Sequence, residues 1–381
     1  MKTKLILLCC CFIAALFTGC KDEPKPNDDP NTIRVKTAGT LPTLIEEGKK
    51  YEITTLKLIG DLNGTDIRYI REMAGCDLEG EATAGKLSVL DLTEANIVEG
   101  GDSYSVLYYT VAGNERSYAN TSNDSIGWYM FYNCASLTSI KLPNSATVIG
   151  YEAFKNCMGL ASVIIGNNVD VIQTFAFSST GITSITIPKS VTRINEYAFT
   201  LCEGLKEYIV ASDNENYSSF NGVLFDKEKT DLIFYPQAKI ATSYTVPDGV
   251  QSIHCNAFYK CPNLTSVTIS NSVTSIEYRA FELCEGLITV TLGNSVAQIG
   301  SWAFGSCSAL REICSTNPTP PETIYAPGPG VDHNGQPISK SPFARTPIED
   351  CSLFVLSGSA EAYKTVYPWR DFGTIGEMII N

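Results

Sequence analysis

The sequence predicts a β-rich solenoid, in which short coils stack into a superhelix, and three observations lead to this prediction. First, a phrase of about 23 residues recurs along the chain. Second, apolar and polar residues alternate over a short run in each copy, which is the pattern of a half-buried strand. Third, Pro, Gly and Asn follow where the chain must turn. The clear copies are marked by Phe131, Phe154, Phe177, Phe199, Phe258, Phe281 and Phe304.

Each predicted coil contains two short extended elements. In the first, Ile185 and Ile187 would point inward, whereas Ser184 and Thr186 would point outward. A second element of the pattern V-x-x-I, such as residues 191–194, turns the chain back. Strands of neighbouring coils then pair in parallel at roughly 4.8 Å. A single coil cannot bury its apolar side alone, so the stack is the folding unit.

The repeated pattern is A-F-x-x-C-x-x-L-x-x-V-x-I followed by V-x-x-I, and it extends from Phe131 to about Ile313. This pattern resembles leucine-rich repeats of the BspA-like class of bacterial surface proteins. The resemblance implies a right-handed leucine-rich-repeat superhelix with short parallel strands and with caps at both ends. It also implies an extracellular protein that serves adhesion or partner binding, whereas the periodicity itself predicts only the solenoid.

Residues 1–19 have the composition of a secretory signal. Two lysines precede an apolar run over residues 5–17, and this run is too short to span a membrane well. The ending at residues 16–20 resembles a lipobox, which implies that Cys20 becomes the lipidated first residue of a bacterial lipoprotein. The alternative is an ordinary cleaved signal.

Residues 20–31 form a proline-rich linker for lipid attachment. The segment Lys21-Asp22-Glu23 resembles the acidic export signal that sends lipoproteins of some Gram-negative anaerobes to the outer face of the outer membrane. We therefore expect a lipid-anchored outer-membrane protein that faces the cell exterior and meets the membrane only through its anchor. A plain solvated linker is the alternative, and both interpretations can hold together.

Residues 32–125 are predicted to be an N-terminal cap that runs into early degenerate repeats, because a terminal repeat must cover the open end of the core. Residues 67–73 have helical spacing, and residues 87–92 form a clean strand pattern. The segment Asp124-Ser125-Ile126 resembles the O-glycosylation acceptor of the same bacteria. This resemblance implies Ser125 as a modification site.

The clear repeats occupy residues 126–314 and include a longer unit at about residues 211–256. Within that unit, residues 222–225 and 231–236 are predicted to be two strands joined by a charged turn. Residues 315–381 comprise a Pro/Gly-rich loop and a C-terminal cap. The aromatic residues expected to cover the end of the stack are Tyr367, Trp369 and Phe372.

The charge of the chain limits the class of partner. At pH 7 the net charge is −13, and the isoelectric point is near 4.7. Because phosphate binding needs a basic face, this charge argues against nucleic acid as a partner. It argues equally against docking on anionic lipid through a basic patch.

Two groups stand out among the fourteen cysteines. One group occupies a single repeat position, which Thr180 fills in one copy, and we interpret it as a ladder of small buried thiols. No C-x-x-C pair indicates zinc. Cys314 and Cys351 lie outside the ladder on successive predicted strands, so they are the candidate disulfide. The ladder cysteines are Cys134, Cys157, Cys202, Cys261, Cys284 and Cys307.

The sequence contains no recognisable catalytic or cofactor-binding set. Neither His254 nor His333 accompanies a nucleophile motif, and no phosphate-binding loop is present. Glu152, Glu196 and Glu277 recur at one outward position, which favours repeat decoration over glycoside hydrolysis. We therefore expect a protein that is not an enzyme and that needs no cofactor or metal.

The predicted function is the binding of an extracellular protein or glycan by a monomer. Repeat stacks present extended surfaces, and outward Ser and Thr, such as Thr138 and Ser139, would supply hydrogen bonds. The family resemblance implies adhesion to host matrix or to other cells. The rival hypothesis is glycan capture, in which aromatic rings stack on sugars. The candidate stacking residues are Tyr104, Tyr108, Tyr109 and Trp128.

Overall fold

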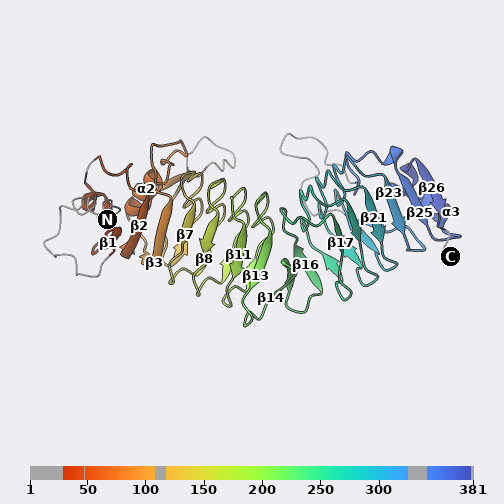
Figure 1. The fold of residues 1–381 in the computed structure, drawn as a ribbon, viewed down its shortest axis with the longest axis horizontal. Helices are drawn as coiled ribbons and strands as arrows, with labels where there is room; N and C mark the ends of the chain where they lie inside the picture. The colour runs from red at the N-terminus through yellow and green to blue at the C-terminus, as the bar shows by residue number, and fades with distance from the viewer. Residues whose placement is uncertain (1–28, 47, 108–116, 325–340, 379–381) are drawn as a thin grey trace, which may run out of the picture. The chain divides into compact units, whose positions relative to one another are not determined.

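A computed structural model describes residues 29–46, 48–107, 117–324 and 341–378 (Figure 1). The chain forms two compact units. Unit 1 comprises residues 1–181 and 193–198, and unit 2 comprises residues 182–192 and 199–381. Within each unit, short strands of successive coils pair in parallel, so the architecture is the predicted parallel-strand β-solenoid.

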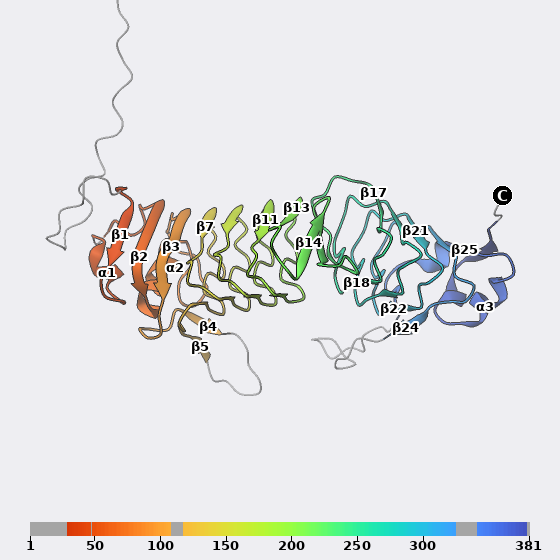
Figure 2. The same ribbon diagram turned by 90° about the horizontal axis from the view of Figure 1, so that it is seen from below.

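Unit 1 contains two parallel sheets, built from the two extended elements of its coils. The first runs in the order β1 (Thr32–Val35), β2 (Thr55–Leu62), β3 (Val89–Ile97), β7 (Ser139–Lys141) and β9 (Ser162–Ile164). The second runs in the order β6 (Ser125–Ile126), β8 (Val148–Ile149), β10 (Val171–Ile172) and β12 (Arg193–Ile194). The strands β4 (Ser105–Leu107) and β5 (Ser117–Ala119) form an antiparallel hairpin, which stands out from the coils in Figure 2.

The helices of unit 1 are α1 (Leu41–Leu44) and α2 (Gly64–Met73). The longer helix, α2, begins at a capping box, in which the Asn63 side chain accepts a hydrogen bond from the Thr65 N–H at 3.1 Å and the Asp66 carboxylate accepts one from the Asn63 N–H at 3.0 Å. The predicted helical spacing over residues 67–73 is thereby confirmed. The apolar residues of its buried face are Ile67, Ile70 and Met73.

Unit 2 contains three sheets, the smallest of which pairs β11 (Ser184–Ile187) with β13 (Glu207–Val210). The second runs in the order β14 (Tyr217–Phe220), β15 (Val223–Asp226), β16 (Asp231–Phe234), β18 (Ser252–Ile253), β20 (Ser275–Ile276), β22 (Gln298–Gly300) and β24 (Glu322–Ile324). The third runs in the order β17 (Ser243–Thr245), β19 (Ser266–Thr268), β21 (Thr289–Leu292), β23 (Glu312–Ser315), β25 (Ser352–Val355) and β26 (Thr374–Glu377).

The two strands predicted in the longer unit are β15 and β16, and they pair antiparallel as expected for a hairpin. In the charged turn between them, the Asp226 carboxylate accepts hydrogen bonds at 2.7 Å from the Thr230 hydroxyl and from the Asp231 N–H. Just after the hairpin, the Tyr235 ring stacks on Phe258 with centroids 4.7 Å apart. Tyr235 precedes Phe258 by 23 residues, so it restores the repeat period with a different aromatic residue.

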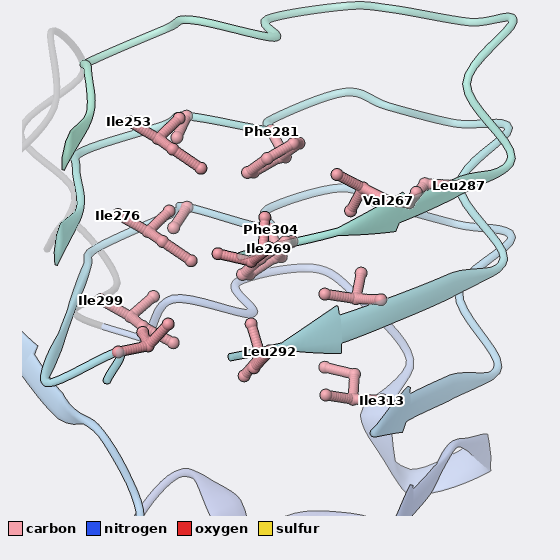
Figure 3. Close-up of a cluster of buried hydrophobic side chains, with 14 of the residues drawn as sticks. Ile253, Val267, Ile269, Ile276, Phe281, Leu287, Leu292, Ile299, Phe304 and Ile313 are labelled. Atoms are coloured by element: carbon pink, nitrogen blue, oxygen red, sulfur yellow. The ribbon is translucent and has the colours of Figure 1, made fainter. Parts of the chain in front are cut away.

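The phenylalanines that mark the repeat form a buried stack in each unit. In unit 1, the Phe131 and Phe154 ring centroids lie 5.3 Å apart, and in unit 2 the Phe281 and Phe304 centroids lie 5.1 Å apart. Figure 3 shows Phe281 and Phe304 between the inward side chains of two strand rows. Phe343, which lies 39 residues after Phe304, extends the stack at 5.8 Å, and the sequence pattern did not reveal it.

The predicted thiol ladder is confirmed, because all six cysteines are buried. The Cys157 thiol donates a hydrogen bond to the Phe131 carbonyl of the preceding coil at 2.9 Å, and the Cys284 thiol does the same to Phe258 at 3.0 Å. Burial raises the pKa of Cys157 to about 12, so this thiol stays protonated at neutral pH.

The predicted disulfide between Cys314 and Cys351 is wrong, since both residues carry free thiols. Cys314 pairs with Phe354 across β23 and β25, three residues beyond Cys351. Three residues of a strand span roughly 10 Å, which exceeds the separation that a disulfide bridges. The Cys351 thiol donates instead to the Leu310 carbonyl at 3.0 Å.

The C-terminal part of unit 2 contains η1 (Ile348–Asp350), α3 (Ala360–Thr365) and η2 (Trp369–Asp371). Trp369 and Phe372 are buried against the core, as expected. Tyr367 does not cover the core, because its side chain is 50% exposed. Tyr363, which was not expected, is fully buried and packs edge-on against Trp369 at 5.5 Å.

A second set of backbone hydrogen bonds joins the coils at the turns that carry the stacked phenylalanines. The N–H of Phe131 donates to the Ala153 carbonyl at 2.7 Å, and the N–H of Phe281 donates to the Ala303 carbonyl at 2.6 Å. The residues two before and two after Phe281, Arg279 and Leu283, also donate to the next coil. We call these bonds the turn ladder.

The turn ladder requires a left-handed backbone at the residues two before and two after each phenylalanine, where φ lies between 52° and 63°. For a residue other than glycine this conformation costs about 1–2 kcal/mol. In the coils of Phe131, Phe154, Phe258, Phe281 and Phe304, three hydrogen bonds between backbone groups, worth about 1 kcal/mol each, offset the two such residues. The residues before are Tyr129, Glu152, Phe175, Tyr197, Asn256, Arg279 and Trp302, and those after are Asn133, Asn156, Ser179, Leu201, Lys260, Leu283, Ser306 and Arg345.

The first coil of the turn ladder in unit 1 leaves carbonyls that have no preceding coil. Arg71 of α2, which is fully buried, donates from Nη1 to the carbonyls of Met130 at 3.1 Å and Tyr132 at 3.4 Å. The Tyr104 hydroxyl donates to the Trp128 carbonyl at 3.0 Å. No preceding coil donates hydrogen bonds to these carbonyls. Arg71 and Tyr104 supply the donors instead and so close this end of the ladder.

We expect Phe281→Ala to destabilise unit 2 by about 3–5 kcal/mol, because it removes one ring from the buried stack and leaves a cavity. Equilibrium urea denaturation measures the change in the free energy of unfolding. Phe220→Ala is the control, because the Phe220 side chain is 48% exposed and lies outside the stack. A loss below about 1 kcal/mol for Phe281→Ala would contradict the stack's role in stability.

We expect Arg71→Met to destabilise unit 1 by about 3 kcal/mol or more, because it leaves buried carbonyls without donors. Hydrogen exchange across residues 64–134 measures the loss. The matched control is Arg68→Met on the same helix, whose side chain is 41% exposed and which should change stability by less than about 0.5 kcal/mol. Equal effects of the two changes would show that Arg71 does not cap the ladder.

Candidate functional site

An aromatic row lies along the turns of unit 1. It contains Trp128, Tyr151, Phe175 and Tyr197, which come from successive coils. Successive ring centroids lie 6.0 Å, 6.1 Å and 5.0 Å apart. The Trp128 side chain is 54% exposed and the other three are half-buried. The row is therefore a ridge of rings that solvent reaches, with one ring for each coil.

The turn ladder determines where these rings lie. Phe175 and Tyr197 occupy left-handed positions two residues before a phenylalanine, and Tyr151 and Trp128 come three residues before one. Because every turn has the same backbone, the rings fall at coil spacing. The sequence analysis missed Tyr151, Phe175 and Tyr197, although an aromatic residue at these two repeat positions in successive copies was a usable signal.

Polar groups fix the edges of the aromatic row. The Trp128 Nε1–H donates to the Gln173 side-chain oxygen at 3.1 Å, and the same oxygen accepts from the Tyr151 N–H at 2.9 Å. The Lys155 ammonium lies 5.2 Å from the Phe175 ring centroid and pairs with Glu152 at 2.8 Å. Flat apolar faces bordered by an amide and by charged groups suit sugar rings and the side chains of a protein partner.

The turns of unit 2 carry a different set of side chains. The Arg279 guanidinium lies 4.9 Å from the Tyr278 ring and 5.9 Å from the Trp302 ring, and Arg345 lies 5.2 Å from Trp302. The Glu282 carboxylate pairs with Arg279 at 3.3 Å. Burial raises the pKa of Glu282, and Arg279 and Arg345 partly oppose this shift.

The outward Ser and Thr rows have fewer hydroxyls available for hydrogen bonds to a partner than the sequence suggested. The Thr138 hydroxyl donates to the Ser88 carbonyl at 3.1 Å, and the Thr265 hydroxyl donates to the Thr242 carbonyl at 3.0 Å. These hydroxyls join neighbouring coils. The strand faces therefore offer a partner fewer free donors than their composition implies.

The four predicted stacking residues do not share one environment. Trp128 is exposed and belongs to the aromatic row. Tyr104 is only 1% exposed, and burial raises the pKa of its hydroxyl, so its prediction as a glycan platform is wrong. The physical reason is that its ring packs inside unit 1 and its hydroxyl caps the Trp128 carbonyl. Tyr108 and Tyr109 lie outside the described residues.

The other predicted sites stay predictions. Cys20 and the segment Lys21-Asp22-Glu23 lie outside the described residues. Ser125 lies half-buried in β6, after the left-handed Asp124. Within residues 29–46, 48–107, 117–324 and 341–378, no group of three His, Cys, Asp or Glu side chains is placed to hold a metal ion. The same part of the chain contains no helix long and apolar enough to cross a bilayer.

Two solved structures are similar to this chain. A leucine rich cell surface protein from Faecalibacterium prausnitzii superposes with a TM-score of 0.53 at 21% identity, covering 86% of this chain and 80% of that one. The pneumococcal vaccine antigen PcpA superposes with a TM-score of 0.54 at 19% identity, with the same two coverages. At this level of identity the likeness shows the fold alone.

The family comparison is more specific than the structural one. No curated protein matches the sequence. A family model described as the BspA type leucine rich repeat region matches six copies, over residues 124–238 and 227–320. These matches cover more than half of the chain and coincide with the coils that carry the stacked phenylalanines and thiols. The chain belongs to the BspA-type leucine-rich-repeat family.

Proposed function

We propose that this protein is a non-catalytic cell-surface scaffold that binds a macromolecular partner, and that the aromatic row of unit 1 is its contact surface. The observation that carries the proposal is the row itself: four rings from successive coils, with Trp128 more than half exposed. Aromatic residues contribute strongly to binding energy when a partner covers them. A ridge that follows the coils suits an extended partner.

The proposed location is the outer face of the outer membrane, with a lipid anchor at Cys20. The Faecalibacterium prausnitzii protein is described as a cell surface protein, which supports a surface location. The signal-like residues 1–19 and the segment Lys21-Asp22-Glu23 support export and anchoring. The first candidate for the function of this scaffold is adhesion to host matrix or to other cells.

Glycan capture is the second candidate, and the surroundings of Trp128 favour it. The indole is exposed and stands beside the Gln173 amide and the half-buried Tyr151 ring. Sugar rings stack on such faces while their hydroxyls bond to neighbouring amides. The two candidates use the same residues, so they differ in the class of partner and not in the surface.

We expect the double change Trp128→Ala and Tyr151→Ala to raise the Kd for the partner at least about tenfold, because two central ring contacts are lost. Binding is measured against a panel of immobilised matrix proteins and neutral polysaccharides. Met158→Ala is the control, since Met158 lies in the same coil as Tyr151 and is 74% exposed but lies outside the row. If binding survives the double change, the row is not the contact surface. The unaltered protein distinguishes the two candidates, because binding to a matrix protein indicates adhesion and binding to a polysaccharide indicates glycan capture.

We expect external protease to remove the protein from intact cells, because the proposed anchor holds it on the outer face. Immunoblotting before and after treatment measures the loss, and lysed cells show that the protease digests the protein. A Cys20→Ser variant lacks the proposed lipid-attachment residue, so it should be released into the culture medium or remain in the inner envelope. Full protection of the unaltered protein on intact cells would contradict the surface location and adhesion with it.

A further inference from the structure

Two buried thiols meet where the segment after α2 contacts the first coil of the turn ladder in unit 1. Cys76 follows the helix and Cys134 is the first thiol of the ladder, and neither is exposed. The Ala74 carbonyl accepts a hydrogen bond from the Ser136 N–H at 3.1 Å. This bond lies two residues from each cysteine and holds the two segments side by side.

Arg71 contacts both segments with one guanidinium group. Its Nη2 donates to the Cys76 sulfur at 3.2 Å, and its Nη1 donates to the Tyr132 carbonyl at 3.4 Å. Among the described residues, no carboxylate lies within ion-pair distance of Arg71. A buried cation without an acidic partner stabilises an anionic sulfur.

The two thiols are chemically different. A hydrogen bond from Cys134 and the charge of Arg71 lower the pKa of Cys76 below its ordinary value, although burial and the charges of Asp77 and Glu81 oppose them. Burial, by contrast, raises the pKa of Cys134. In the reduced, folded protein, one sulfur therefore favours the thiolate while its neighbour stays a thiol.

We propose that Cys76 and Cys134 are the site of a disulfide, formed by exchange with an external disulfide as unit 1 folds and before both thiols are buried, that locks the segment after α2 onto the first coil. The Cys76 thiolate attacks one sulfur of the external disulfide and displaces the other as a thiolate. Cys134 then loses its proton and attacks the Cys76 sulfur, which releases the second external thiolate. The two cysteines lose two electrons and two protons, and the external disulfide is reduced to two thiols.

Three other cysteines of the described residues differ from this pair. The Cys157 thiol donates to a backbone carbonyl, and burial raises its pKa to about 12. Cys314 and Cys351 lie three residues out of register on adjacent strands. The pair beside Arg71 is therefore a better site for the exchange than Cys157, Cys314 or Cys351.

The proposed disulfide has a structural consequence. It joins residues 58 positions apart, and the loop that it closes includes the β4–β5 hairpin. A crosslink across a loop of this size reduces the conformational freedom of the unfolded chain. It also keeps Arg71 against the carbonyls of the turn ladder. Oxidation should therefore protect unit 1 and leave unit 2 unchanged.

The test uses the full chain, refolded in buffer that contains oxidised and reduced glutathione. After alkylation of free thiols, peptide mapping should find Cys76 linked to Cys134, and hydrogen exchange at α2 should slow at least about tenfold relative to the reduced protein. Cys314→Ser is the control and should keep the link. Full alkylation of both cysteines, or a link from Cys134 to Cys157, would overturn the proposal.

The variant Cys134→Thr keeps the test free of folding defects. Thr180 and Thr346 occupy the ladder position in other coils. The Thr346 hydroxyl donates to the Phe304 carbonyl of the preceding coil as the thiols do, whereas the Thr180 hydroxyl donates to the Phe177 carbonyl of its own coil. This variant should fold with the stability of the reduced protein, lose the link, and show the same exchange rates in oxidising and reducing buffer. An oxidant-dependent slowing of exchange at α2 that persists in Cys134→Thr would equally overturn the proposal.

Discussion

The turn ladder is the interaction on which the rest of this solenoid depends. Parallel strands hold neighbouring coils on two sides, but only the hydrogen bonds around each phenylalanine hold them on the third. These bonds set the rings at stacking distance and place Cys157, Cys284 and Cys307 beneath a phenylalanine carbonyl of the preceding coil. The left-handed residues that flank each ring are strained, and they persist because the ladder would otherwise leave buried backbone groups unpaired.

A ladder of this kind has a direction, and its first coil presents carbonyls that need donors. Unit 1 supplies them from one helix and one loop, through Arg71 and Tyr104. The buried guanidinium of Arg71 contacts a side chain as well as backbone carbonyls, because it also donates a hydrogen bond to the Cys76 sulfur. At this end of the ladder, Arg71 and Tyr104 thus couple the N-terminal segment to the repeats by hydrogen bonds, and the proposed Cys76–Cys134 disulfide would couple them covalently in the oxidised protein.

The repeat fixes the scaffold and leaves the turn side chains free to vary. Positions that are alike in backbone carry rings in unit 1 and an arginine-flanked tryptophan in unit 2. The strand faces are less free, because Thr hydroxyls on them bond to the preceding coil. Binding specificity in such a stack is therefore expected at the turns, where a change of side chain costs the core nothing.

The sequence by itself determined the solenoid, the regular spacing of the phenylalanines, the thiol ladder and the hairpin of β15 and β16, because each follows from a period or an alternation that is local in the chain. Tertiary structure decided the rest. Tyr104 and Trp128 look alike as aromatic residues in polar surroundings, yet one caps a carbonyl inside unit 1 and the other stands in solvent. Cys351 was misassigned for the same reason, and Cys76 was overlooked: register and burial depend on residues far away in sequence, which no local pattern encodes.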